Sequence, residues 1–154
     1  MITIFEADYK NPTHATSIIE VLNSYSMDKM GLESPLSNFV KQNLVKELAQ
    51  IPNAFSILAL DGDKACGLAN CFIGFSTFKA KKLINIHDLA VLPEARNRGI
   101  GTKLLDQIER KARSLDCCKI TLEVRDDNQA KNLYTRFGFK SSTPEFLYWA
   151  KDLD

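Results

Sequence analysis

Hydrophobic and polar residues alternate along the first half of the chain in patterns that predict a strand, two helices and a strand pair. Residues 2–7 alternate as in a half-buried strand. Apolar residues then recur at helical spacing, which predicts helices over about residues 13–25 and 36–50. Residues 54–60 and 65–75 predict two strands, and the Asp-Gly between them is a strong hairpin signal, so we expect this pair to be antiparallel.

The next part of the chain alternates strand and helix patterns. The run LINIHDLAVL, residues 83–92, is apolar and β-branched enough for a buried strand, which Pro93 ends. Apolar residues from Gly99 to Leu115 recur at helical spacing, and residues 117–124 read as another strand. A strand, helix, strand order implies a right-handed crossover between parallel strands. We therefore expect an α/β fold with a mixed, mostly antiparallel twisted sheet flanked by helices, and a central parallel strand pair.

The C-terminal part is expected to hold one short helix and two strands. Residues 126–137 predict a helix that begins at Asp127 or Asn128 and ends at the glycine that follows it. Residues 138–141 and 145–151 then predict a final strand pair.

Length and composition favour a single domain over residues 1–154. Charged residues make up 25% of the chain and no Pro, Gly or Ser run marks a linker. The net charge of +1 argues against a general nucleic-acid binder, which would need a clear cationic excess. No segment approaches the roughly 20 apolar residues of a membrane span, and the N-terminus has no apolar signal core. We expect a cytoplasmic protein that binds neither nucleic acid nor membrane.

The cysteines do not form a metal-binding pattern. No CxxC pair occurs among Cys66, Cys71, Cys117 and Cys118, and the chain has only two histidines, so we expect no metal site. All four cysteines lie in apolar, strand-like sequence, where free cysteine behaves as a small hydrophobe. Because disulfides are rare in the cytosol, we expect reduced thiols.

The segment ARNRGIGTKLL combines features that weaken a helix at the point where a helix is expected to begin. Glycine in a helix is less favourable than alanine by roughly 1 kcal/mol. A helix N-terminus, however, offers unpaired N–H groups that attract phosphates. Gly99 and Gly101 would let those groups approach a diphosphate, and Arg96 and Arg98 would add charge-assisted hydrogen bonds. The alternative is an ordinary turn with solvated arginines.

Two other phosphate motifs do not fit this segment. An ATP-binding P-loop needs Gly-Lys followed by Ser or Thr, whereas Gly101 is followed by Thr102 and then Lys103. The dinucleotide fingerprint needs a third glycine at the position of Leu104, and its loop should follow the strand at once. Thr102 can still offer its hydroxyl to an anion.

Three segments together resemble the GNAT superfamily of N-acetyltransferases. Arg96, Gly99 and Gly101 fill its Arg/Gln-x-x-Gly-x-Gly/Ala signature, DLAVLPE precedes it, and LYTRFGF follows it. The resemblance covers residues 84–140 and implies the GNAT fold with acetyl-CoA as cofactor. Residues 1–83 are compatible with the family's first strand, two helices and hairpin, and we expect substrate choice to lie there.

By this resemblance, main-chain groups hold the coenzyme. The amides of the glycine loop would bind the pyrophosphate, the strand before it would pair with the pantetheine arm like an added strand, and an N–H near Ala90 or Val91 would serve the oxyanion. The family's usual Asn stands seven residues before Tyr134, where this chain has Asp127, with Asn128 one step later. The implied cofactor-binding residues are Leu89, Ala90, Val91, Arg96, Asn97, Arg98, Gly99, Ile100, Gly101, Thr102 and Asn128, with Asp127 as the alternative to Asn128.

Tyr134 resembles the general acid of the family. A phenol has a reference pKa near 10, so it would be protonated at neutral pH and could give its proton to the departing thiolate. The alternative is a packed aromatic side chain, which is common at helical spacing.

The base would come from the strand that precedes the glycine loop. His87 matches a position where some relatives carry a glutamate, and strand alternation would place it on the face of Leu89 and Val91, opposite Asp88. Histidine changes charge near neutral pH, so His87 is our first choice. The alternatives are a hydrogen-bonded core histidine, Asp88 or a water chain. Asp88 is otherwise expected to anchor backbone or orient a partner, and Glu33 could bind a cationic substrate.

The resemblance therefore implies an acetyl-CoA-dependent N-acetyltransferase that acts on a primary amine of a small molecule by direct attack in a ternary complex. One alternative is acetylation of a protein N-terminus or lysine, which would need an open peptide groove. Another is a non-catalytic acyl-CoA-binding module. The resemblance is also compatible with a homodimer.

Overall fold

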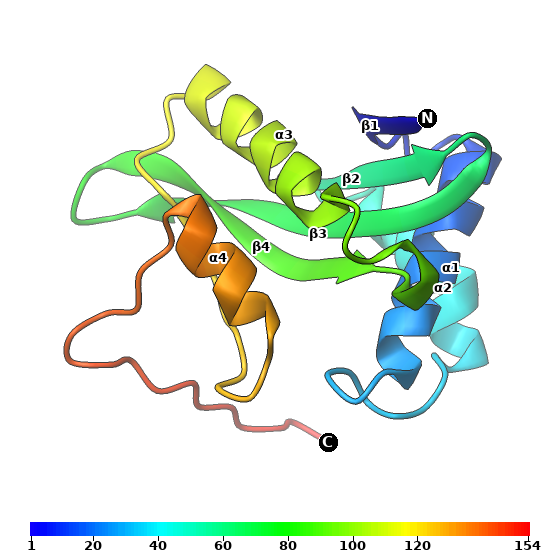
Figure 1. Cartoon of the computed structure of the whole chain (residues 1–154). Helices are drawn as coiled ribbons and strands as arrows, with labels where there is room; N and C mark the ends of the chain where they lie inside the picture. The colour runs from blue at the N-terminus through cyan, green and yellow to red at the C-terminus, as the bar shows by residue number, and fades with distance from the viewer.

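A five-stranded sheet forms the centre of the structure, a computed structural model that describes residues 1–154 (Figure 1). The strands lie side by side in the order of the sequence: β1 (Ile2–Glu6), β2 (Ala54–Asp61), β3 (Lys64–Ser76), β4 (Lys81–Val91) and β5 (Ile120–Leu122). Neighbours from β1 to β4 are antiparallel, whereas β4 and β5 are parallel. The predicted fold class, a mostly antiparallel mixed sheet with one parallel pair, is confirmed.

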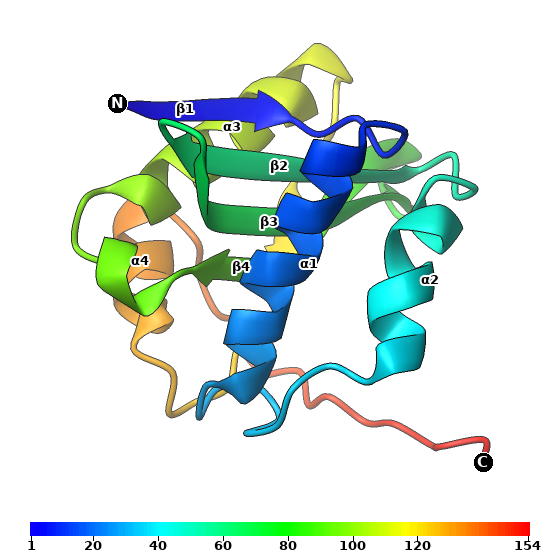
Figure 2. The ribbon, with the colours of Figure 1, turned by 90° about the vertical axis from the view of Figure 1, so that its right-hand side faces the viewer.

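Helices cover both faces of the sheet (Figure 2). One face is covered by α1 (Pro12–Met27) and α2 (Asn38–Leu48), and the other by α3 (Ile100–Ser114) and α4 (Ala130–Phe137). A short 3-10 helix, η1 (Pro93–Ala95), joins β4 to α3. Gly138 ends α4 at a positive φ of 111°, as the sequence predicts. None of the helices combines the length and the apolar character needed to cross a bilayer.

Each face of the sheet has its own hydrophobic core. Ile57 of β2 packs in the core beneath α3, whereas its neighbour Leu58 packs in the core beneath α1. Both side chains are almost fully buried, so the central strands are covered on both sides. This two-sided burial explains why their sequences are nearly continuous apolar runs.

Two predicted features of the C-terminal half differ from the structure. The strand expected over residues 117–124 is limited to Ile120–Leu122, and the final strand pair expected at 138–141 and 145–151 is absent. A strand forms only where a neighbouring strand has an unpaired edge, and β5, the strand next to β4, is just three residues long. The chain after α4 is therefore extended and exposed along the outside of the molecule (Figure 1).

The four cysteines are unpaired. Cys66 and Cys71 lie buried in β3, and burial raises the pKa of both thiols, strongly so for Cys71. Such thiols are poor nucleophiles at neutral pH, which fits the structural role predicted for them. Cys117 and Cys118 are half-buried in the connection between α3 and β5, outside the strand in which the sequence placed them.

Candidate active site

Strand β4 departs from regular pairing at His87. Asn70 of β3 pairs with Asp88 and Cys71 pairs with Ile86, so His87 has no partner across the strand pair and forms a β-bulge. Before the bulge, Ile84 and Ile86 face the core beneath α3, whereas Leu89 and Val91 do so after it. The bulge thus shifts the alternation of side chains by one residue.

This shift places His87 and Asp88 on the same face of the sheet. The His87 ring packs edge-on against Phe72, with centroids 5.8 Å apart, and Asp88 accepts a hydrogen bond of 3.0 Å from Asn70 Nδ2. Phe72 and Asn70 are two residues apart on β3, so they share a face. The predicted opposite placement of His87 and Asp88 is therefore wrong. The alternative of a hydrogen-bonded core histidine is also wrong, because the His87 side chain is exposed.

The edge of β4 that faces β5 is paired only at its beginning. The two strands pair from Ile84 to Ile86, and β4 continues to Val91 without a partner on that side. The N–H group of Leu92 donates to Cys66 on β3, so by alternation Ala90 also faces β3 while Leu89 and Val91 face the open edge. An extended ligand can pair with this edge as another strand would. Of the two amides predicted to serve the oxyanion, that of Val91 points to the open edge and that of Ala90 does not.

The loop before α3 presents a row of unpaired backbone N–H groups. None of the N–H groups from Asn97 to Thr102 donates a hydrogen bond within the chain, and no side chain caps the helix. Asn97 and Gly99 adopt positive φ angles of 62° and 76°. Left-handed residues that alternate with ordinary ones turn successive N–H groups toward one point, which makes a concave anion site. The first turn of α3 carries no acidic residue that would neutralise its positive end.

Glycine is favoured at these two positions of the loop for different structural reasons. Gly99 has the left-handed backbone that a side chain disfavours, and a Cβ there would meet no other atom. A Cβ on Gly101 would lie 2.7 Å from Leu133 Cδ2 of α4. Gly101 therefore also lets α4 pack against the start of α3, a role that the sequence did not indicate.

The two arginines of the loop are paired with carboxylates. Arg96 donates to Asp28 Oδ2 at 3.0 Å and to the carbonyl oxygen of Val91 at 3.2 Å, and Arg98 donates to Asp61 at 2.8 Å. The Met30 N–H group and then Arg96 hold the pKa of Asp28 below its usual value. Because both arginines are about half exposed, these ion pairs contribute only about 0–1 kcal/mol each and leave the guanidinium groups able to turn to a stronger anion.

Tyr134 has a hydroxyl group that is free to donate. Its ring packs against Phe139, with centroids 5.8 Å apart, and against the core beneath α3. Burial raises the pKa of Tyr134 to about 12, and the nearby Tyr25 adds to the increase. The hydroxyl makes no hydrogen bond within the chain, yet it is not fully enclosed. The Tyr134 hydroxyl is therefore protonated at neutral pH, and its hydrogen is not used in a hydrogen bond to another part of the protein.

Tyr25 lies at the site, although no pattern in the sequence indicated it. It lies near the end of α1, and its hydroxyl donates to the carbonyl oxygen of Met30 at 3.4 Å. Burial raises the pKa of Tyr25, and the negative charges of Asp88 and Asp28 raise it further. Tyr25 therefore lies near both Asp88 and Tyr134, which are far apart in the sequence. No residue spacing within one segment predicts that Tyr25 lies close to these two residues, because their proximity depends on how α1 and α4 pack on opposite sides of β4.

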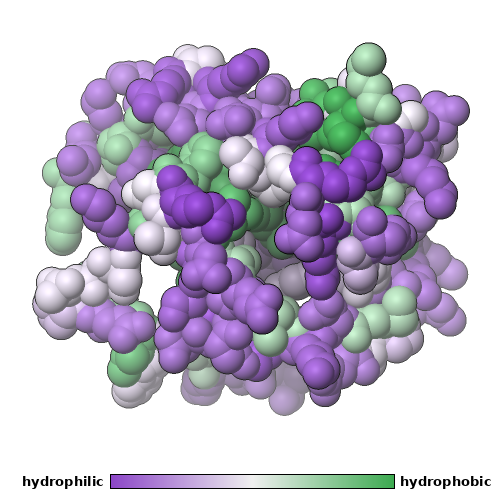
Figure 3. Space-filling model, viewed as in Figure 1, coloured by the Kyte–Doolittle hydropathy of each residue, from purple (hydrophilic) through white to green (hydrophobic).

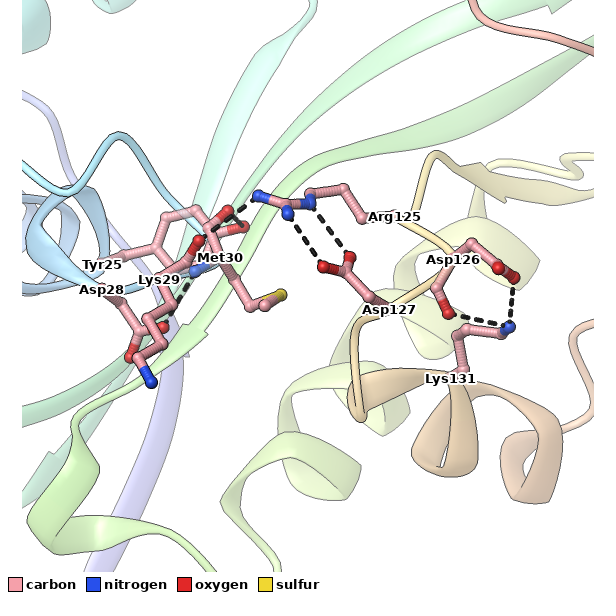
Figure 4. A network of polar contacts seen from close by, with 8 residues as sticks. All are labelled: Tyr25, Asp28, Lys29, Met30, Arg125, Asp126, Asp127 and Lys131. Carbon is pink, nitrogen blue, oxygen red and sulfur yellow. Dashed lines mark hydrogen bonds and ion pairs between the residues drawn. The ribbon is translucent and has the colours of Figure 1, made fainter.

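Arg125 bridges the α1–α2 connection and the β5–α4 connection (Figure 4). It donates to both carboxylate oxygens of Asp127, at 3.1 and 2.9 Å, and to the carbonyl oxygen of Lys29 at 3.3 Å. Asn128 accepts from the Ala130 N–H group at 2.8 Å and so helps to start α4. Both candidates for the family's asparagine position thus have partners within the chain.

The remaining charged candidate, Glu33, lies exposed in the α1–α2 connection without an ion-pair partner. On the face shown in Figure 3, hydrophilic side chains cover most of the surface, and hydrophobic side chains show between them where α3 and α4 lie close together. The site elements described above thus meet around the open edge of β4: the loop before α3, the bulge, and the ends of α1 and α4.

Comparison with known proteins identifies relatives of this chain. The profile of the acetyltransferase (GNAT) family matches residues 19–139. The uncharacterized N-acetyltransferase YhfO of Bacillus subtilis is 26% identical over 136 residues, which are 84% of this chain and 85% of that protein. The thialysine N-epsilon-acetyltransferase of Bos taurus is 31% identical over 83 residues, which are 53% of this chain and 48% of that protein.

A solved structure shares the fold across the whole chain. The aminoglycoside N-acetyltransferase AAC(6')-Iy, solved in complex with CoA, superposes with a TM-score of 0.79 and covers 100% of this chain and 96% of its own. The sequence identity is 16%, so this likeness concerns the fold alone.

Proposed function

Because the chain belongs to the acetyltransferase (GNAT) family, we propose that it transfers the acetyl group of acetyl-CoA directly to a primary amine of a small molecule, with both substrates bound together. The observation that carries this proposal is the run of unpaired N–H groups from Asn97 to Thr102 beside the unpaired edge of β4. The first is suited to a diphosphate, and the second to an amide-containing arm. Coenzyme A carries both.

The proposed division of labour follows from the positions of the donors. The amides of the loop and the side chains of Arg96 and Arg98 hold the diphosphate, and the hydroxyl of Thr102 adds a further donor. Leu89 and Val91 pair with the pantetheine arm, and Ala90 keeps the strand attached to β3. The Val91 N–H group donates to the acetyl carbonyl oxygen, on which negative charge develops during transfer. Asn128 is the residue we assign to the coenzyme from the β5–α4 connection.

Two side chains move the protons. Acetyl-CoA supplies an activated acetyl group whose thiolate leaves when the amine nitrogen attacks. His87 accepts a proton from the acceptor ammonium and so produces the free amine, which alone is nucleophilic. Tyr134 gives its phenolic proton to the departing sulfur. The exposure of His87 and the free hydroxyl of Tyr134 support these roles, since both groups can reach bound substrates.

A sequence relative supports a small acceptor. The relative from Bos taurus carries the name of a thialysine acetyltransferase. We therefore propose a small-molecule primary amine as the acceptor class. Acetylation of a protein N-terminus or lysine is the alternative that an experiment has to distinguish from acetylation of a small molecule.

Thiol release from acetyl-CoA with a panel of acceptors tests the proposal. Amino acids, polyamines and amino sugars form one arm, and short peptides with free N-termini or lysines form the other. We expect release with members of the first arm. Preference for peptides would point to protein acetylation, and tight acetyl-CoA binding without release by any acceptor would point to a binding module.

Replacement of His87 by alanine is expected to lower kcat/KM at least tenfold at pH 7, because most of the acceptor is then ammonium and has lost its base. The deficit should narrow as the pH rises and free amine becomes more abundant. Added imidazole should restore part of the rate, since the exposed position leaves access for it. A deficit that is the same at every pH and insensitive to imidazole would remove His87 from this role.

We also propose that the enzyme acts in the cytoplasm as a homodimer. The four free thiols suit a reducing compartment. Large hydrophobic side chains after α4 are 74–85% exposed, from Phe146 to Trp149, and exposed patches of this kind mark association surfaces.

Replacement of Leu147 and Trp149 together by serine is expected to weaken this dimer at least tenfold, because each buried apolar side chain contributes about 1.5–3 kcal/mol. Sedimentation equilibrium measures the effect. Replacement of the neighbouring Lys151 by serine serves as the control and should leave the dimer intact. A wild-type protein that remains monomeric at all concentrations would overturn the homodimer.

A further inference from the structure

A row of hydrogen-bonded polar side chains crosses the sheet beneath α1 and ends at Asp88. The Tyr9 hydroxyl lies 2.8 Å from Ser56 Oγ, which donates to Asn70 Oδ1 at 2.6 Å. Asn70 Nδ2 in turn donates to Asp88 Oδ2 at 3.0 Å. Ser56, Asn70 and Asp88 lie on the neighbouring strands β2, β3 and β4, so the row runs across the sheet toward the bulge.

The middle of this row lies inside an apolar layer. Ser56 is 0% exposed and Asn70 is 4% exposed, and the layer around them is the core that contains Leu58, Leu68 and Ala90. Buried polar groups destabilise a fold unless they are hydrogen-bonded, whereas apolar side chains at these two positions would need no partners. The buried polar atoms of the row all have hydrogen-bond partners, which points to a role at its end more than to a gain in stability.

The direction of the hydrogen bonds is fixed by the donors available. Ser56 has one hydroxyl hydrogen, which it gives to Asn70, so Tyr9 must be the donor to Ser56. Every donor in the row therefore points toward Asp88. Its Oδ2 atom is held by Asn70, whereas its Oδ1 atom accepts no hydrogen bond within the chain and is not enclosed.

The free oxygen of Asp88 lies beside the bulge and the open edge of β4. Asp88 directly follows the bulged His87 on the same face of the sheet, and directly precedes the open edge at Leu89. The charge of Asp88 also reaches Tyr25, whose pKa it raises. A carboxylate with one fixed and one free oxygen beside a histidine is suited to bind an alkylammonium group and present it for deprotonation.

We propose that Asn70, backed by Ser56 and Tyr9, is a positioning residue that orients the Asp88 carboxylate so that its Oδ1 atom binds the ammonium form of the acceptor. The acceptor then gives one proton to His87 and attacks as the free amine, while Asp88 stays an anion throughout. This inference rests on the proposed function and names its substrate class more narrowly: amines that are cationic at neutral pH.

The test compares a cationic and an uncharged acceptor in the wild type and in two variants. Asp88→Asn keeps the shape of the side chain and its hydrogen bond to Asn70, so it should fold. With an alkylamine that the wild type acetylates, we expect its KM to rise at least tenfold, since a charge-assisted hydrogen bond is lost. With aniline, which is neutral at pH 7, KM should change less than twofold. Asn70→Ala should show the same split with a smaller rise.

The controls separate positioning from folding and from the proposed function. Asn53→Ala removes an asparagine that bonds the carbonyl oxygen of Ile73 at the far end of β3, and it should leave both KM values unchanged. The Kd for coenzyme A should be unaltered in all variants. If the wild type acetylates an alkylamine and Asp88→Asn leaves its KM unchanged, only this inference fails. If no amine supports thiol release by the wild type, the proposed function fails and this inference with it.

Discussion

Replacement of Tyr134 by phenylalanine is expected to lower kcat about hundredfold, the usual order for loss of a general acid, with little change in the Kd for acetyl-CoA. The phenol makes no hydrogen bond within the chain, unlike that of Tyr25. Its removal therefore leaves no broken partner, and the ring keeps its contact with Phe139. A fall in kcat in a variant that melts at the wild-type temperature reports on proton donation alone.

The pH profile gives this prediction a second readout. Because burial raises the pKa of Tyr134 to about 12, the acid is protonated across the range in which the enzyme can be assayed. Its contribution is present below that pKa and is lost only above it, so the wild type should show no decline from Tyr134 between pH 7 and pH 10. Tyr148→Phe, in the exposed segment after α4, is the matched control. An unchanged kcat for Tyr134→Phe with a good acceptor would remove Tyr134 from the chemistry.

The fold could be predicted from the sequence because its signals are local. The Asp-Gly turn sets the β2–β3 hairpin, the helical spacing of apolar residues defines α3, and Gly138 ends α4. The final strand pair could not be predicted correctly, because the apolar pattern of residues 145–151 indicates a strand but not whether a partner edge is available. Strand formation there depends on β5, which is short.

The candidate site was predictable only where its residues are contiguous. The glycine loop can be recognised from six consecutive residues, and its N–H groups are unpaired, as expected for an anion site at the start of a helix. The bulge at His87 depends on how β3 and β4 pair, so alternation along β4 alone wrongly placed His87 on the face of Leu89 and Val91. Tyr25, through the charge of Asp88, and Asn70, through a hydrogen bond to Asp88, join the site by interactions across long sequence distances, which no spacing rule along one segment can detect.

Replacement of Thr102 by aspartate is expected to weaken coenzyme A binding about thirtyfold while stabilising the free protein slightly. Thr102 is exposed in the first turn of α3, among the unpaired N–H groups. An aspartate there would repel a bound diphosphate by about 2 kcal/mol at the effective dielectric of a protein surface. The same carboxylate would interact favourably with the positive end of the helix, worth about 0.3–1 kcal/mol.

These opposite signs distinguish loss of the site from loss of the fold. Calorimetric titration with coenzyme A measures the Kd, and thermal unfolding of the free protein measures the stability. Thr102→Asn has nearly the same size without the charge, and we expect it to bind within about threefold of the wild type, since at most one hydroxyl hydrogen bond is exchanged. The weakening by aspartate should shrink at high salt, because exposed charges are screened. If Thr102→Asp binds coenzyme A as the wild type does, the diphosphate does not lie at the start of α3, and the open edge of β4 alone would have to account for cofactor binding.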